Sequence, residues 1–275
     1  MDDHAHTDVP RIRWTDTDAE SSVDTLVREE PLELRVGGIP IAVVMRSPGH
    51  DLELARGFML TERVVSSPEQ ITAVRHCTTV TDPDAEDNVV QVTLRSDVEV
   101  DFARLRRNMY ASSSCGICGK ATLDAALSHA PPLPPDDLTL SPEALYLLPD
   151  KLREQQKVFD RTGGLHAAAL FDETGTLLVA REDIGRYNAV DKTIGWAATE
   201  NLLPLSRATM MVSGRLSYEI VQKALAARIP ILAAVSSPSS LAVQLATRGG
   251  LTIVAFLRGR SASVYCGEQR ICRDQ

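Results

Sequence analysis

Short apolar segments alternate with amphipathic ones near the end of the chain, and this alternation restricts the possible folds more than any other feature. Predicted strands and helices follow one another over 208–212, 217–227, 229–235, 239–247 and 251–256. Strands and helices of these lengths are typical of βαβ units, which place parallel strands side by side in a buried sheet. We therefore expect the C-terminal part of the chain to be an α/β domain.

The N-terminal half has the pattern of β-strands around one amphipathic helix. The predicted elements are strands over 31–36 and 39–45, a helix over 51–61, and strands over 71–80 and 88–94. Gly37-Gly38 separates the first two strands and is typical of a hairpin turn. Farther along, the patterns predict one helix over 141–160, a hairpin of 166–171 with 176–179, and a helix over 188–200.

These patterns divide the chain into four parts. Residues 1–28 are acidic and poor in apolar side chains, and we expect a disordered tail there. Residues 29–110 are expected to form an N-terminal α+β subdomain. Residues 111–136 are expected to hold a mobile cysteine loop, a helix and a proline-rich connector, and 137–275 a C-terminal α/β domain.

The charge and composition of the chain exclude several classes of function. The net charge of −8 argues against general binding to nucleic acid or to an anionic membrane surface. No apolar run reaches the ~18 residues that span a bilayer, and the acidic N-terminus does not resemble a signal peptide. We therefore expect a cytoplasmic protein, and its five cysteines do not suggest a disulfide framework.

Two of the cysteines, Cys115 and Cys118, lie three positions apart in a loop of serine and glycine before a predicted helix. The helix N-terminus and the nearby Lys120 favour a thiolate, which is the reactive form of cysteine. The pair is therefore a candidate carrier of sulfur. Two other interpretations stay open: half of a zinc site, although no second ligand pair has a suitable spacing, and two small buried residues.

Three loops that follow predicted strands carry groups that bind phosphate. Residues 213–215 (SGR) and 236–240 (SSPSS) each precede a predicted helix, and 256–261 (FLRGRS) brings two arginines to the end of the last predicted strand. Helix N-termini, hydroxyls and guanidinium groups all bind phosphate oxygens. The chain has neither a Walker A loop nor a GxGxxG sequence, so the pattern indicates a phosphate pocket without specifying the ligand.

A polar segment at 182–192 (EDIGRYNAVDK) lies between a predicted strand and a predicted helix. Arg186 and Lys192 are candidates for contact with an anion, and Asp183 and Asp191 for orienting these cations. The alternative is an ordinary helix start with ion pairs on the surface. His166, after a glycine pair, is a candidate proton donor or metal ligand, although a lone histidine is more often structural.

The chain contains, in this order, the segments SSCGICGK, TGGLHAAAL, EDIGRYNAVDK, SGRLSYEIVQKA, AVSSPSSLAVQLA, and FLRGR followed by VY. This ordered set resembles the FdhD family, whose members are accessory sulfurtransferases of formate dehydrogenase. The resemblance extends from about residue 29 to residue 266. One position departs from the family pattern: Tyr187 stands where the family usually has histidine, which puts in doubt any proton-transfer role there.

The resemblance implies a mechanism and a fold. A cysteine desulfurase would load sulfane sulfur onto Cys115 as a persulfide, and Cys118 would assist its transfer. The protein would pass the sulfur to the molybdenum or tungsten bis-molybdopterin guanine dinucleotide cofactor, which formate dehydrogenase requires. The fold would be α/β, a cytidine-deaminase-like mixed sheet flanked by helices with a smaller β-rich N-terminal subdomain. The protein would be a homodimer with no metal of its own.

The same resemblance assigns cofactor binding to the C-terminal domain. The candidate residues are Ser213, Gly214, Arg215, Ser237, Ser239, Phe256, Leu257, Arg258, Gly259, Arg260 and Ser261. Two other functions are kept as alternatives. One is a zinc-dependent nucleotide deaminase or hydrolase, although the deaminase signature (H-x-E with P-C-x-x-C) is not met. The other is a cofactor-binding chaperone that does no sulfur chemistry.

Overall fold

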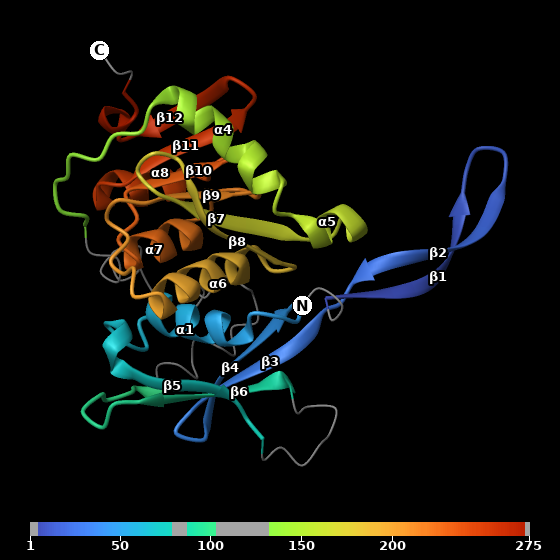
Figure 1. Ribbon diagram of the computed structural model, residues 1–275, viewed down its shortest axis with the longest axis horizontal. Helices are drawn as coiled ribbons and strands as arrows, with labels where there is room; N and C mark the ends of the chain where they lie inside the picture. Colours follow the sequence, from blue (N-terminus) through green and yellow to red (C-terminus); the bar gives the residue numbers. More distant parts are fainter. Residues whose placement is uncertain (1–4, 79–86, 103–131, 273–275) are drawn as a thin grey trace.

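The computed structural model of the protein describes residues 5–78, 87–102 and 132–272, whose strands form two larger sheets and one hairpin (Figure 1). The six-stranded sheet contains β7 (His166–Phe171), β8 (Leu177–Asp183), β9 (Thr209–Val212), β10 (Ile231–Ala234), β11 (Thr252–Arg258) and β12 (Ser261–Cys266). Their order across the sheet is β12-β11-β10-β9-β7-β8.

Strands β9, β10 and β11 are parallel, which confirms the prediction from the alternating strands and helices. β7 runs antiparallel to both β8 and β9, and β12 runs antiparallel to β11, so the sheet is mixed. The mixed α/β fold is thus confirmed. The likeness to cytidine deaminases stays a prediction.

Helices cover both faces of this sheet, because successive residues of a strand point to opposite sides. On one face lie α6 (Arg186–Thr199), α7 (Tyr218–Ala226) and α8 (Ser240–Gly249), and on the other lies α4 (Pro142–Arg153), which is followed by α5 (Lys157–Thr162). Met210 packs under the first group of helices and its neighbour Met211 under α4. Within the described ranges, no helix has the length and apolar composition needed to span a membrane.

A second, four-stranded sheet lies beyond the helices α6 and α1 (Asp51–Thr61), as Figure 1 shows. It contains β3 (Glu30–Val36), β4 (Ile39–Arg46), β5 (Ile71–His76) and β6 (Val89–Leu94) in the order β4-β3-β6-β5, with a 3₁₀ turn η2 (Pro68–Gln70) before β5. The hairpin at Gly37-Gly38 and the helix over 51–61 are as predicted. The boundaries expected for the subdomains stay predictions.

The two sheets are joined by a close crossing of α1 and α6 that only glycine permits. A Cβ atom placed on Gly195 of α6 would lie 1.8 Å from the carbonyl oxygen of Glu53, and one placed on Gly57 of α1 would lie 1.9 Å from that of Asp191. Both distances are far below any van der Waals contact. The backbones of the two helices therefore touch, and the helices hold the sheets in one arrangement.

The prediction of a disordered tail over 1–28 is wrong for the described part of that segment. β1 (His6–Trp14) and β2 (Ala19–Val27) form an antiparallel hairpin that projects from the body (Figure 1). Ile12 and Trp14 are 62% and 78% exposed on it. The acidic average composition concealed an alternation of apolar and polar residues. The base of the hairpin is held by tertiary packing of Ala5 against the body.

The prediction of a single helix over 141–160 is also wrong, because the helical conformation is interrupted between α4 and α5. The carboxylate of Glu182, on β8, accepts hydrogen bonds from the backbone N–H groups of Val158 (3.0 Å) and Phe159 (2.8 Å). These N–H groups lie in the first turn of α5, where a helix has no partners of its own. A residue distant in sequence therefore starts the second helix. The final 3₁₀ turn, η4 (Glu268–Arg270), follows β12.

We predict that Gly195→Ala lowers the free energy of unfolding by about 2 kcal/mol or more, because α1 must move away from α6 to admit the methyl group. Urea unfolding followed by circular dichroism measures this change. The matched control is Thr199→Ala, at the exposed end of the same helix, for which we expect a change within about 0.5 kcal/mol. Equal stability of the two variants would contradict the close crossing.

Candidate functional site

The loops predicted to bind phosphate meet at one edge of the six-stranded sheet. The parallel strands β9, β10 and β11 all end at this edge, so the loops 213–217, 235–239 and 256–261 lie there together. The start of β7 and the end of β8 lie at the same edge, since Ala168 of β7 pairs with Val212 at the end of β9 and His166 pairs with Asp183 at the end of β8. The glycine-histidine segment and the polar segment 182–192 therefore reach the same edge. Ligands of open α/β sheets bind at the carboxyl ends of strands.

The first hollow at this edge, here called the large cavity, has a volume of about 670 Å³. It is lined by Pro149, Asp150, Leu152, Arg153, Gln156, Phe159, Gly163, Gly164, Leu165, His166, Ser213, Val235, Leu257, Arg258 and Gly259. Four of these were predicted as cofactor-binding residues, namely Ser213, Leu257, Arg258 and Gly259, and a fifth, His166, was a candidate proton donor or metal ligand. The sequence did not predict that residues of α4 and α5 line this cavity. α4 lies on the opposite face of the sheet from α6, α7 and α8, α5 follows it, and no local motif indicates that these two helices reach the site.

Hydrogen bonds to the backbone hold the polar groups of the large cavity in place. The Ser213 hydroxyl accepts from the backbone N–H of Ala167 at 2.8 Å. Arg258 donates from Nε to the carbonyl oxygen of Val235 at 2.9 Å. That bond uses one of the five guanidinium N–H donors, and the others make no hydrogen bond to described residues. Arg258 is thus oriented and still able to bind an anion.

The second hollow, here called the small cavity, has a volume of about 400 Å³. It is lined by Arg186, Tyr187, Arg215, Leu216, Ser217, Glu219, Ser237, Pro238 and Ser239. Three of these, Arg215, Ser237 and Ser239, were predicted as cofactor-binding residues. The structure therefore divides the predicted site between two cavities. Gly214 lies at the division, since Ser213 lines one cavity and Arg215 the other.

The remaining predicted residues line neither cavity. Phe256 has a left-handed backbone conformation (φ 51°) and is 41% exposed. The guanidinium of Arg260 lies over the ring of Tyr146, 5.7 Å from its centroid. Ser261 begins β12, opposite Arg258. These three residues shape the turn that presents Leu257, Arg258 and Gly259.

Tyr187, which replaces the usual histidine of the motif, is the centre of a polar network in the small cavity. Its hydroxyl accepts from Arg186 Nη2 (2.5 Å) and from Ser217 Oγ (3.3 Å), and it donates to Glu219 Oε2 (3.1 Å). Burial raises the pKa of this phenol above its ordinary value. A protonated hydroxyl with three partners orients its neighbours and does not transfer protons near neutral pH.

His166 is half-buried at the sheet edge, next to Gly214. Burial lowers the pKa of His166 below its ordinary value, and the positive charges of Arg186 and Arg215 lower it further, while Asp183 opposes them. The imidazole is therefore neutral at neutral pH. His166 itself lines the large cavity, and Gly214 beside it is followed by Arg215 of the small cavity.

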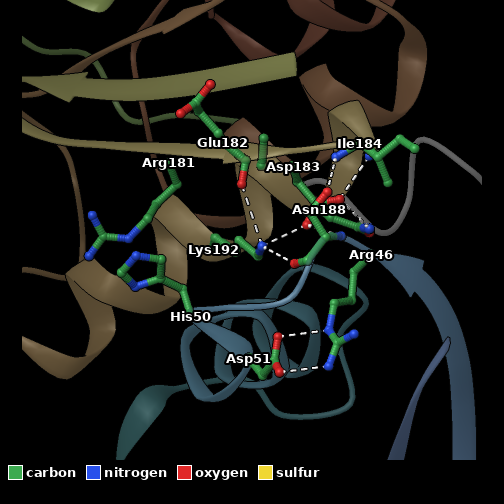
Figure 2. Close-up of polar contacts among 12 residues, drawn as sticks. Arg46, His50, Asp51, Arg181, Glu182, Asp183, Ile184, Asn188 and Lys192 are labelled. Carbon is green, nitrogen blue, oxygen red and sulfur yellow. Dashed lines mark hydrogen bonds and ion pairs between the residues drawn. The ribbon is translucent and has the colours of Figure 1, made fainter. Parts of the chain in front are cut away.

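Lys192 and Asp183 form a buried ion pair, with Nζ 2.6 Å from Oδ2 and exposed fractions of 1% and 0% (Figure 2). Lys192 also donates to the carbonyl oxygen of Ser47 at 2.9 Å. The hypothesis that Lys192 contacts an anion at the site is therefore wrong, and so is the alternative of surface ion pairs. The local motif does not show that Lys192 is buried, because its partner Ser47 comes from a distant part of the chain. Among the two cations of the segment, only Arg186 lines a cavity.

Asp191 has a similar structural role deeper in the protein. Its carboxylate accepts from Lys223 Nζ at 2.9 Å and from the Thr61 hydroxyl at 2.7 Å. Burial dominates and raises the pKa of Asp191 to about 6. The interaction joins α6 to α7 and to the end of α1, away from the two cavities.

The predicted catalytic cysteines, Cys115 and Cys118, lie outside the described residues. The cysteines in the described ranges, Cys77, Cys266 and Cys272, form no disulfide bond with one another. No group of three or more histidine, cysteine, aspartate or glutamate side chains in those ranges is arranged to hold a metal ion.

Known proteins resemble this chain along almost its whole length. Residues 27–272 match the FdhD/NarQ family. The sulfur carrier protein FdhD of Streptomyces avermitilis is 52% identical over 265 residues, covering 94% of this chain and 93% of the relative. The protein of the same name from Mycobacterium tuberculosis is 50% identical over 254 residues, covering 90% and 92%.

A solved structure supports the fold. The crystal structure of a candidate formate dehydrogenase accessory protein from Desulfotalea psychrophila is similar to this chain with a TM-score of 0.76 at 21% identity. The match covers 98% of this chain and 100% of that protein.

We predict that Lys192→Met lowers the free energy of unfolding by about 3–5 kcal/mol, because it leaves the buried Asp183 carboxylate without its partner. The double variant Lys192→Met/Asp183→Asn is expected to lose less than the single variant. Arg207→Met is the control, since Arg207 pairs with carboxylates on the surface and should contribute about 1 kcal/mol or less. Urea unfolding of the three variants measures these free energies. If Lys192→Met lost no more free energy of unfolding than Arg207→Met, a structural role for the buried pair would be contradicted.

Proposed function

This chain belongs to the FdhD/NarQ family, and on that premise we propose that it carries sulfur to a molybdenum cofactor. Cys115 takes sulfane sulfur from a cysteine desulfurase as a persulfide. The S–S bond then breaks with the Cys115 thiolate as leaving group, and the outer sulfur passes to the metal of bis-molybdopterin guanine dinucleotide, the substrate of the transfer, whose reduced metal supplies the two electrons that convert sulfane sulfur to a sulfide ligand. The sulfurated cofactor serves formate dehydrogenase. Cys118 assists the transfer, and a homodimer in the cytoplasm is part of the same proposal.

The observation that carries this proposal is the convergence of three phosphate-competent loops on one sheet edge. A protein that only stored sulfur would need a reactive cysteine and no nucleotide pocket. Here the large cavity has a volume within the usual range for small-molecule sites, roughly 300–1,000 Å³. It combines an oriented arginine, Arg258, with a hydroxyl, Ser213. These groups suit the phosphate end of a nucleotide.

Other side chains of the large cavity suit the guanine base. The Asp150 carboxylate is an acceptor that matches two adjacent N–H donors of guanine. The ring of Phe159, which already carries the Arg153 guanidinium 4.9 Å from its centroid, offers an aromatic face. We assign the guanine nucleotide end of the cofactor to this cavity. Arg215, Ser237 and Ser239 would contact another part of the same bulky substrate.

We predict that Cys115 becomes persulfidated when the protein is incubated with cysteine and a cysteine desulfurase. Mass spectrometry of the tryptic peptide should show the added mass of one sulfur atom, and Cys115→Ala should abolish it. Cys272→Ala is the control, because Cys272 is exposed and outside the proposed loop. Formate dehydrogenase activity should be lost in a strain that carries Cys115→Ala. Full activity with a folded Cys115→Ala protein would reject the proposal in favour of a cofactor chaperone.

We predict that Arg258→Gln weakens binding of guanosine diphosphate by about tenfold or more, since a hydrogen bond to a charged group contributes about 1.5–3 kcal/mol. Isothermal titration calorimetry measures the affinity. Arg207→Gln removes an exposed arginine that lines neither cavity and pairs with Asp137 and Glu173 on the surface, and it should bind like the wild type. Equal affinities for Arg258→Gln and the control would remove the large cavity as the nucleotide site.

A further inference from the structure

Three helices begin at the small cavity. Arg186 and Tyr187 open α6, Ser217 precedes α7 and Ser239 precedes α8, and all four residues line the cavity. The first N–H groups of a helix have no partner within it, and the helix dipole makes this end positive. Ser239 caps α8 with its own hydroxyl, whereas α6 and α7 have no side-chain cap. The uncapped ends leave donors available for an anion.

Two arginines add full positive charges to these partial ones. Arg186 lies over the Tyr187 ring, 4.2 Å from its centroid, and its bond to the Tyr187 hydroxyl orients the guanidinium. Arg215 follows β9 and is exposed, and it makes no hydrogen bond or ion pair with described residues. A guanidinium fork bonds two phosphate oxygens at once, so both side chains suit a phosphate group.

The backbone holds the two loops of the cavity side by side. Leu216 donates its N–H to the carbonyl oxygen of Ser237 at 3.1 Å, and Ser239 donates to that of Leu216 at 2.9 Å. These bonds form a parallel bridge beyond the ends of β9 and β10. The backbone that carries Ser217, Ser237 and Ser239 is therefore held in place before any ligand arrives, which lowers the entropic cost of binding.

One acidic group opposes an anion in the cavity. Glu219 lines the wall, and its carboxylate accepts the hydrogen bond of Tyr187. Two guanidinium groups and three helix N-termini outweigh a single carboxylate, so the cavity retains a positive potential. Glu219 then tunes the affinity downward, which is useful at a site that must release its ligand.

We infer that the small cavity is a second, separate phosphate-binding site, which takes a phosphate or diphosphate group. The inference rests on the proposed function for its natural occupant: a bis-dinucleotide cofactor carries two diphosphates, and the large cavity of a chain accounts for one. We assign the second to the small cavity of the same chain, which adjoins the large cavity at Gly214, rather than to the large cavity of the partner in the proposed homodimer. The alternative source of the same chemistry is free phosphate or diphosphate. The two cavities, divided at Gly214, would hold the two nucleotide arms of one substrate on a single chain.

Pyrophosphate is the probe for the site itself. Isothermal titration of the full-length protein with pyrophosphate should show binding that Arg215→Gln weakens by about tenfold or more. Glu219→Gln should strengthen binding several-fold, because it removes the opposing charge. Arg248→Gln is the control: it removes one positive charge from the last turn of α8, at the opposite end of that helix from Ser239 of the small cavity. Circular dichroism confirms that each variant folds.

His166 lines the large cavity beside Gly214, so its titration gives a second readout of the small cavity when it is followed in Arg258→Gln, which removes the phosphate ligand of the large cavity. Burial is the main cause of the lowered pKa of His166, and the charges of Arg186 and Arg215 lower it further; pyrophosphate between these two arginines should therefore move the NMR titration of His166 upward. The shift should be much smaller in Arg215→Gln. Unchanged pyrophosphate affinity in both Arg215→Gln and Glu219→Gln would overturn the inference, whatever the outcome of the persulfide assay.

Guanosine diphosphate distinguishes the two sources of phosphate. Two molecules bound per chain, one lost in Arg215→Gln and the other in Arg258→Gln, would support the second nucleotide arm as occupant. One molecule per chain, with pyrophosphate binding that still depends on Arg215, would support a site for free phosphate. Failure of the proposed function itself would appear separately, as an absence of persulfide on Cys115.

Discussion

The buried ion pair between Lys192 and Asp183 is the interaction on which the arrangement of the site depends. Asp183 ends β8 and Lys192 lies in α6, so the pair fixes the first turns of that helix against the sheet. Two fully buried charges are costly to remove from water unless hydrogen bonds satisfy them. Here Asp183 also accepts from the N–H of Gly185 (2.8 Å) and from Asn188 Nδ2 (2.9 Å). The network determines where α6 begins and thus where Arg186 and Tyr187 point.

The same network connects the two sheets. The segment between β4 and α1 supplies three contacts: the carbonyl oxygen of Ser47 to Lys192, its N–H to Asp183, and its hydroxyl to the N–H of Ile184. Arg46 and Asp51, in a two-bond ion pair, hold that segment against α1 (Figure 2). Because α1 also touches α6 through Gly57 and Gly195, the sheets cannot shift without breaking buried polar bonds. A rigid support of this kind keeps the strand-end loops in register.

The site that results has two cavities with different chemistry. The large cavity combines an oriented arginine with an aromatic ring and a carboxylate, which suits a nucleotide. The small cavity is built from helix N-termini, arginines and hydroxyls, which suits the phosphate or diphosphate part of a ligand. A bulky substrate with two nucleotide arms could use both at once. Such anchoring at its ends would leave the metal centre of the cofactor free to meet a sulfur carried on a cysteine.

Local patterns in the sequence were sufficient to predict the parallel strands β9, β10 and β11, the hairpin at Gly37-Gly38 and the strand-end loops. These features depend on periodicity and on turn residues, which neighbouring positions determine. The cysteine pair and the ordered motifs likewise identified the family without any coordinates.

Only the tertiary structure decided which charged residues are buried and which face a ligand. Lys192 looked like an anion ligand, but Ser47, more than a hundred positions away, removes it from solvent. Glu182 starts α5 from another element, and packing at its base supports a hairpin where composition indicated disorder. The division of the predicted site into two cavities depends on the same long-range contacts. Burial and charge pairing arise between distant segments, and a one-dimensional pattern does not contain them.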